Sequence, residues 1–124
     1  MADDTHQYLE IFERRAYLSG MDMSPEKFDA MDAAATEAAE VLKALSNPQR
    51  LRLLCSLLAG PRSVGELEQA LGASQSYVSG QLARLRSEGM VQAERDGRTI
   101  YYSLADTRVI PIIERLYDVF CPAP

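Results

Sequence analysis

Few of the residue types that usually carry chemistry are present in this chain. Its 124 residues include no tryptophan, one histidine and two cysteines. Two cysteines are too few for a disulfide-rich secreted scaffold. A single histidine also provides few of the ligands that a metal site needs. There is no Cys-x-x-Cys motif, no glycine-rich phosphate loop and no histidine placed to activate a nucleophile. We therefore expect no enzyme activity, no metal and no cofactor.

Long hydrophobic runs are also missing. None approaches the ~18 residues that would cross a membrane, and the acidic N-terminus MADDTHQYLEIFERR does not resemble a signal peptide. With 47% hydrophobic and 25% charged residues, the composition is that of a globular protein. We predict a cytoplasmic protein without membrane contact, whose two cysteines are normally reduced.

The net charge of -5 has an uneven distribution. Residues 1–46 carry a net charge of -6, residues 47–104 carry +2 and residues 105–124 carry -1. All seven basic residues of the middle segment are arginines, whose planar guanidinium groups suit phosphate recognition. The acidic charge therefore lies outside the segment that is best suited to bind nucleic acid.

The first 45 residues have helical patterns. We predict an N-terminal extension over residues 1–27, helical near its start, followed by a domain over residues 28–121. Ser24 and Pro25 are typical of a helix start, and the alanine-rich stretch 28–45 favours a helix. Its apolar stripe suits either a dimer contact or packing within the chain, and comprises Met31, Ala35, Ala38, Leu42 and Leu45.

A second helix is predicted from Pro48 to Leu58, with one apolar face formed by Leu51, Leu54, Cys55 and Leu58. Two shorter helices follow at 64–71 and 75–87. Ser63 with Glu66 is typical of a capping box, Ser74 of an N-cap, and Gly72 of a tight turn between them. Five residues are predicted to form the core of this helix-turn-helix: Leu67, Leu71, Val78, Leu82 and Leu85.

After Gly89 the hydrophobic period changes from 3.6 to 2. Residues 90–95 and 99–104 are predicted to be strands, joined by a turn centred on Asp96-Gly97 in which both residues have positive φ. A last helix is expected from about Asp106 to Cys121, and Pro111 either starts its regular part or kinks it. The predicted fold is mainly α with a small β-hairpin, the order of elements in a winged helix-turn-helix.

This order predicts DNA binding. Short polar side chains occupy the leading end of the second short helix, where a recognition helix meets base edges. Arginines follow one turn later, and two more lie near the hairpin tip, where a wing contacts the DNA backbone. The predicted DNA-binding residues are Ser74, Gln75, Ser76, Tyr77, Ser79, Gln81, Arg84, Arg86, Arg95 and Arg98.

Four segments of the chain resemble the ArsR/SmtB family of bacterial repressors. They are Leu42–Leu54, which contains Ser46-Asn47-Pro48-Gln49-Arg50, and Ser74–Ser79, Gln81–Arg86 and Glu88–Val91. The resemblance covers about residues 28–120. It implies a homodimer joined through its first and last helices. It also implies binding to an imperfect palindrome in double-stranded operator DNA, and release by an inducer.

The metal sites known in this family do not match. Its thiol-rich site corresponds to Ser63-Val64-Gly65-Glu66, which has no cysteine, and its zinc site in the last helix corresponds to a segment with acidic residues but no histidine. His6 lies in the N-terminal extension. The resemblance therefore gives no support for metal sensing.

The positions of Cys55 and Cys121 are similar to those in the persulfide-responsive SqrR/BigR-like subgroup. That similarity implies that a di- or polysulfide bridge forms between the two thiols and loosens DNA binding, which would control sulfide-response genes. A direct disulfide requires Cα atoms roughly 4.4–6.8 Å apart, and each inserted sulfur adds up to about 2 Å. Thiols held slightly too far apart would accept inserted sulfur while resisting plain oxidation.

Other interpretations of the two cysteines remain open. Cys55 alone is typical of a small core residue, and Cys121 could ligate haem. The pair could also serve a repressor that senses peroxide or electrophiles. From other classes, the chain could be a thiol enzyme that handles sulfur, or a dimeric interaction module without DNA binding.

Overall fold

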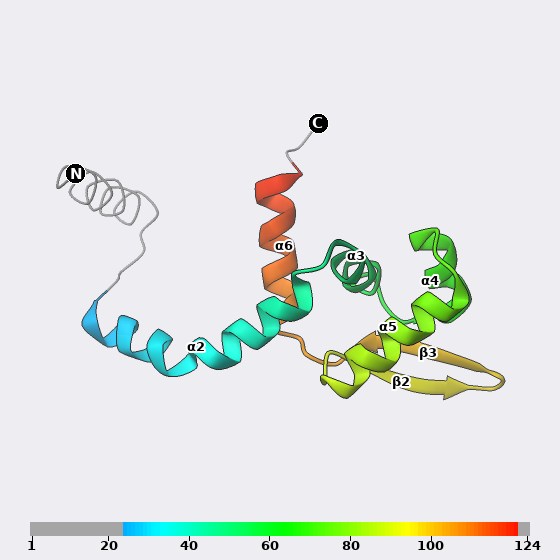
Figure 1. Cartoon of the computed structure of the whole chain (residues 1–124), viewed down its shortest axis with the longest axis horizontal. Coiled ribbons are helices and arrows are strands. Elements are labelled where there is room, and N and C mark those ends of the chain that lie inside the picture. Colours follow the sequence, from blue (N-terminus) through cyan, green and yellow to red (C-terminus); the bar gives the residue numbers. More distant parts are fainter. Residues whose placement is uncertain (1–23, 122–124) are drawn as a thin grey trace. The chain divides into compact units, whose positions relative to one another are not determined.

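The computed structural model describes residues 24–121. The helix expected near the N-terminus, and most of the predicted extension, lie outside the described residues. The described elements are α2 (Pro25–Leu45), α3 (Pro48–Ser56), β1 (Arg62–Ser63), α4 (Val64–Leu71), α5 (Gln75–Ser87), β2 (Val91–Asp96), β3 (Thr99–Leu104) and α6 (Val109–Phe120) (Figure 1). Contacts divide the chain after Ala39, so residues 40–121 are described below as one unit.

Side-chain caps define where the helices begin. The Oδ1 atom of Asn47 accepts hydrogen bonds from the backbone N–H groups of Gln49 (2.9 Å) and Arg50 (3.2 Å), and Pro48 occupies the first helical position. Ser63 forms the predicted capping box with Glu66, and Ser74 accepts from Tyr77 N at 3.3 Å. These caps satisfy backbone donors that have no partner within the helix.

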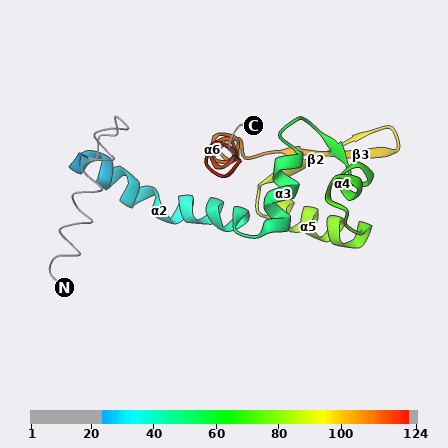
Figure 2. The same ribbon diagram turned by 90° about the horizontal axis from the view of Figure 1, so that it is seen from above.

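The sheet has three antiparallel strands in the order β1-β3-β2, so the predicted hairpin gains a short third strand. Arg62 pairs with Tyr102, and Ser63 pairs with Tyr101. The strands lie beside α4 and α5, and only the tip of the hairpin extends past these helices (Figure 2). Sequence periodicity did not predict β1, because two residues are too few to show an alternating pattern.

The predicted turn is wrong by one residue. Asp96 ends β2 and pairs with Thr99, so the two loop residues are Gly97 and Arg98. Gly97 has a φ of 65°, and no residue other than glycine has a positive φ among the described residues. A glycine at the first loop position followed by a residue with negative φ is the pattern of a type II′ turn.

One hydrophobic core joins the helices and the sheet of this unit. All five residues predicted for the helix-turn-helix core are buried in it. Along α2, Val41, Ala44 and Leu45 are buried, whereas Leu42 is 55% exposed, so within the predicted stripe Leu45 packs inside the chain and Leu42 does not. In α3 and its C-cap the buried apolar residues are Leu53, Leu54 and Leu57. Of the four residues expected to form the apolar face, Leu54 is buried, Leu51 is half-buried, and Cys55 and Leu58 are exposed.

Helix α6 begins at Val109, three residues later than predicted, and Pro111 lies in its first turn. A proline is tolerated there because the first backbone N–H groups of a helix have no helical acceptor. Val109 and Ile113 are buried in the core, whereas Tyr117 and Phe120 are 62% and 74% exposed. The C-terminal half of α6 therefore presents apolar side chains to solvent.

Two glycines allow a matched test of these helices. Gly72 ends α4 with a φ of 61°, whereas Gly80 lies inside α5, and an added Cβ would meet no atom within 4 Å at either site. We expect Gly72→Ala to destabilise the fold by about 1 kcal/mol through backbone strain. We expect Gly80→Ala to stabilise it by about 0.5–1 kcal/mol, because alanine favours helix interiors. Urea denaturation measures the free energy of unfolding of both variants. If both substitutions changed it by the same amount in the same direction, the left-handed conformation of Gly72 would be contradicted.

Candidate functional site

Helix α5 has a buried face and a polar leading end. Val78, Leu82 and Leu85 are fully buried, which fixes the helix on the core. The side chains at its start face solvent, and Tyr77 is 36% exposed. The exposed residues among those predicted to bind DNA are Ser74, Gln75, Ser76, Tyr77, Ser79, Arg84, Arg86, Arg95 and Arg98.

Gln81 differs from the other predicted DNA-binding residues. Its side chain is half-buried, and its Oε1 atom is shielded from solvent without a hydrogen-bond partner. A buried carbonyl oxygen without a donor is unfavourable. Gln81 therefore turns its amide oxygen inward, whereas its neighbour Ser79 stays exposed.

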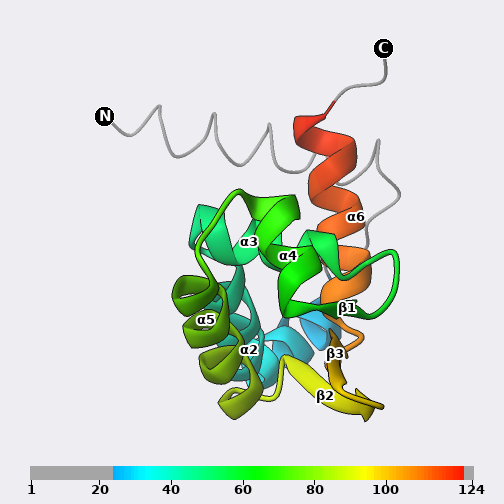
Figure 3. The ribbon, with the colours of Figure 1, turned by 90° about the vertical axis from the view of Figure 1, so that its right-hand side faces the viewer.

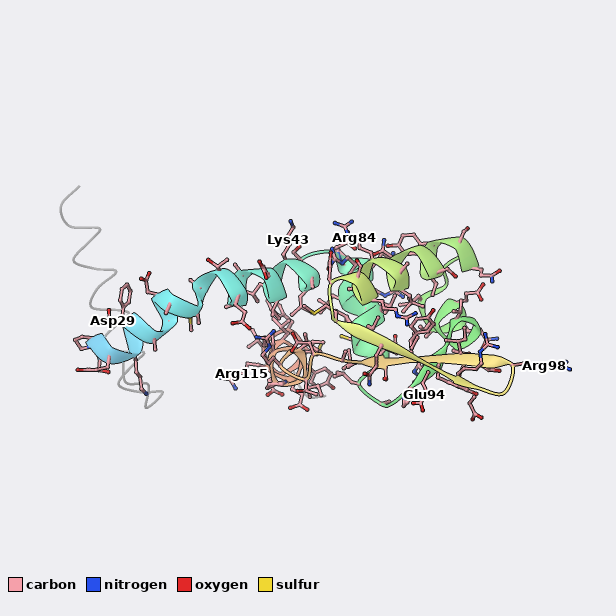
Figure 4. All side chains as sticks on the ribbon, turned by 90° about the horizontal axis from the view of Figure 1, so that it is seen from below. Asp29, Lys43, Arg84, Glu94, Arg98 and Arg115 are labelled. Carbon is pink, nitrogen blue, oxygen red and sulfur yellow. The ribbon has the colours of Figure 1, made fainter. Side chains whose placement is uncertain are left out.

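The predicted basic residues are separated into two groups. Arg84 and Arg86 lie in the last turn of α5, and Arg84 Nε donates to Glu88 Oε1 at 3.4 Å. Arg95 lies on β2, and Arg98 projects from the tip of the hairpin, far from Arg84 (Figure 4). Two separated basic groups, one at the end of α5 and one on the hairpin, suit contacts to DNA phosphates at more than one point.

Arg50 is a buried residue that the sequence analysis missed. It is 7% exposed, and its Nη2 atom donates to Glu88 Oε2 at 2.8 Å. The bond joins the first turn of α3 to the C-cap of the predicted recognition helix. A signal was present in the sequence, since Arg50 shares the helical spacing of the buried residues Leu53, Leu54 and Leu57.

Cys55 and Cys121 line the same cavity, with a volume of about 690 Å³. Cys55 comes from α3 and Cys121 directly follows α6, and Figures 1 and 3 show these helices next to each other. Both cysteines are free and exposed, so the interpretation of Cys55 as a core residue does not hold. The two thiols, 66 positions apart in the sequence, share one apolar surface.

The surroundings of Cys55 change its acidity. Cys55 is exposed, but its partial burial desolvates the thiolate and raises the pKa of the thiol. The negative charge of a Cys121 thiolate raises the pKa of Cys55 further.

The rate of Cys55 alkylation should reflect this raised pKa. Because the thiolate is the nucleophile, we expect the midpoint of its pH–rate profile to lie above that of the same cysteine in the urea-unfolded chain. In Cys121→Ser the midpoint should move down, since the second cause is removed, but remain above the unfolded value. Iodoacetamide labelling followed by peptide mass spectrometry measures each cysteine separately. A folded midpoint at or below the unfolded one would contradict the desolvation of Cys55.

Within residues 24–121 there is no group of three or more His, Cys, Asp or Glu residues that could hold a metal ion. The same described part of the chain has no helix with the length and hydrophobicity needed to cross a membrane.

Comparison with known proteins identifies the family. Residues 47–93 match the model of the bacterial regulatory protein, arsR family. The biofilm growth-associated repressor of Xylella fastidiosa is 43% identical over 91 residues, 73% of this chain and 80% of the relative. The transcriptional activator HlyU of Vibrio cholerae is 39% identical over 107 residues, 86% of this chain and 96% of the relative.

Solved structures agree with the sequence matches. The transcriptional repressor BigR from Xylella fastidiosa superposes with a TM-score of 0.73 at 41% identity, over 77% of this chain and 97% of that one. A homodimeric winged helix-turn-helix DNA-binding domain from Mycobacterium bovis superposes with a TM-score of 0.60 at 34% identity, over 73% and 84%. The chain therefore belongs to the ArsR family of winged helix-turn-helix transcriptional regulators, which bind DNA and are not enzymes.

Proposed function

We propose that this protein is a dithiol repressor that binds operator DNA when Cys55 and Cys121 are reduced. Reactive sulfane sulfur bridges the two thiols and releases the DNA, so that sulfide-response genes are expressed. The observation that carries this proposal is the shared cavity of the two cysteines. Its support from relatives is the similarity to a named repressor over most of the chain.

The proposed DNA-binding form is a homodimer. A dimer presents two recognition helices to the two halves of a palindrome. The Mycobacterium bovis domain is homodimeric. The side of α6 outside the thiol cavity supports the same arrangement here, because Pro111, Ile112 and Val119 line a second apolar hollow there and Val119 is 62% exposed. Large exposed apolar side chains that gather on one helix are typical of a protein interface.

The bridging reaction needs no cofactor. One cysteine thiolate attacks the outer sulfur of a persulfide, which forms a protein persulfide and releases the donor as a thiol. Each further persulfide lengthens this chain by one sulfur and releases another thiol. The second cysteine thiolate then attacks the sulfur next to the terminal one, and hydrosulfide leaves. The two protein thiols are oxidised, and sulfane sulfur is reduced to hydrosulfide.

The bridge is proposed to act on DNA affinity by drawing α3 and the end of α6 together. Helix α3 is hydrogen-bonded to the helix-turn-helix at two places. Arg50 bonds Glu88 after α5, and Arg52 Nη2 donates to the carbonyl of Leu71 at the end of α4, at 3.4 Å. A displacement of α3 therefore reaches both helices of the DNA-binding motif.

Cysteine replacement tests the proposal. We expect the reduced wild type and both variants, Cys55→Ser and Cys121→Ser, to bind operator DNA with similar affinity. Persulfide treatment should weaken binding by the wild type by at least about tenfold, a coupling within the range seen for allosteric proteins, and leave both variants unchanged. Fluorescence anisotropy measures affinity, and mass spectrometry of the linked Cys55 and Cys121 peptides counts the inserted sulfur atoms.

Two outcomes of this experiment would replace the proposed function by a different one. An equal loss of DNA affinity after peroxide, with a two-sulfur bridge, would indicate a general redox repressor. Sulfur turnover with no change in DNA affinity would indicate a thiol enzyme that handles sulfur.

A further inference from the structure

We propose that the thiol cavity selects neutral, apolar sulfane-sulfur donors and discriminates against anionic ones. This inference rests on the proposed function, because it names the class of donor that the same two cysteines accept. A donor must enter between the walls of this cavity before it can react with the sulfur of either cysteine.

Most of the cavity wall is apolar. Side chains from α3 and the residues after it form one wall, and side chains from α6 form the other. The apolar lining residues are Leu51, Leu58, Ile113, Leu116, Tyr117 and Phe120. A cavity of about 690 Å³ lies within the usual size range of small-molecule sites, and such a wall favours donors with alkyl groups over strongly hydrated ones.

The charged groups of the wall are all acidic. Glu114 and Asp118 line the cavity, and no lysine, arginine or histidine lines it among the described residues. Glu114 and Asp118 are four residues apart, which places both carboxylates on one face of α6, and Cys121 follows this helix as its C-cap. An anion that approaches Cys121 therefore meets two like charges beside a surface that gives it little hydration.

The nearest arginine of α6 does not offset these charges. Arg115 does not line the thiol cavity but an adjoining hollow, which shares only Leu116 and Phe120 with that cavity. Figure 4 shows Arg115 on the side of α6 that faces away from the hairpin. The raised pKa of Cys55 is consistent with the same environment, because apolar walls and a neighbouring negative charge disfavour any anion there.

Organic trisulfides allow the charge of a donor to be changed without changing its reacting atoms. A cysteine thiolate attacks the central sulfur and displaces one alkyl thiolate, and the second cysteine thiolate attacks the same sulfur and displaces the other. The products are a trisulfide bridge between Cys55 and Cys121 and two alkyl thiols, so no additional oxidant is needed. Dipropyl trisulfide is the neutral probe, and glutathione trisulfide is the anionic one.

The experiment measures the rate of bridge formation in the full-length reduced protein with each probe. Each rate is divided by the rate of the same probe with a small neutral thiol, which removes differences in intrinsic reactivity. We expect the normalised rate of dipropyl trisulfide to exceed that of glutathione trisulfide by at least about tenfold at low salt. Added salt should accelerate only the anionic probe, since it screens the repulsion.

Two variants test whether the difference in rate between the neutral and the anionic probe arises from the charges of the cavity wall. In the double variant Glu114→Gln/Asp118→Asn, the ratio of the neutral to the anionic rate should fall by about fivefold or more. In Glu94→Gln, which removes one charge of the same sign from β2, the ratio should stay close to that of the wild type. Using the ratio cancels any change in thiol pKa, because that change affects both probes alike.

The outcomes separate this inference from the proposed function. Equal normalised rates for the two probes, or a ratio that is unchanged in the double variant, would overturn donor selection while leaving the dithiol sensor intact. Failure of both probes and of persulfide to bridge the cysteines would instead overturn the proposed function.

Discussion

Glu88→Ala is expected to lower the free energy of unfolding by about 2–3 kcal/mol, a large effect for a side chain that is more than one third exposed. The reason lies in its partner. Arg50 is buried, and its Nη2 atom donates to Glu88 Oε2 at 2.8 Å. Without Glu88, a guanidinium group would remain in the protein interior with no carboxylate beside it. Removing one partner of a buried ion pair costs more than the pair itself contributes.

The position of Arg50 strengthens this expectation. Its Nε atom is already buried without a hydrogen-bond partner, so the guanidinium depends on the bond from Nη2. The side chain also lies on the same face of α3 as Leu53 and Leu54, which are fully buried. Solvent therefore cannot easily replace the lost carboxylate.

The matched control is Arg84→Ala. Arg84 contacts the other oxygen of Glu88 at 3.4 Å, but its side chain is 59% exposed, so its loss should cost less than about 0.5 kcal/mol. The double variant Arg50→Met/Glu88→Ala should be more stable than Glu88→Ala alone, because the buried charge is gone. Urea denaturation of the four proteins gives the comparison. A Glu88→Ala variant no less stable than Arg84→Ala would show that the buried ion pair does not matter for stability.

Local signals in the sequence predicted the helix-turn-helix closely. The caps at Ser63 and Ser74 involve residues within three positions along the chain, so neighbouring residues determine them. The core of the motif was also predictable, since its apolar residues recur with helical spacing between polar ones. The same reasoning gave the strands of the hairpin, but not the exact position of its turn.

The faces of α3 and α6 were harder to predict. Leucines occupy several sides of α3 and the residues after it, so the pattern alone favours more than one buried face. In the folded chain, the core contains Leu53, Leu54 and Leu57, whereas the cavity is lined by Leu51, Cys55 and Leu58. Three of the four residues expected on the core face, all but Leu54, therefore form part of the wall of the candidate thiol site. Sequence identified both cysteines, but only the packing of α3 against α6 places them on one surface.

The second large effect is expected at the start of α5. Replacing Gln75, Ser76 and Ser79 together with alanine should weaken binding to the operator by about a hundredfold or more, since each contact to a base edge contributes about 1–3 kcal/mol. All three side chains are exposed, and the buried face of α5 is untouched. The fold should therefore keep its stability, and binding to unrelated DNA should change little, because phosphate contacts dominate it.

A wing variant provides the contrast. Arg95→Ala/Arg98→Ala should weaken binding to operator and unrelated duplexes alike and reduce the salt dependence by about two phosphate contacts, because both arginines are predicted to meet the backbone. Operator sequences selected from a random duplex library serve as probes, and anisotropy titrations at several salt concentrations measure both effects. If the triple variant of α5 binds the operator as tightly as the wild type, these side chains do not read bases. If the wing variant loses affinity only for the operator, Arg95 and Arg98 recognise sequence or groove shape rather than phosphate.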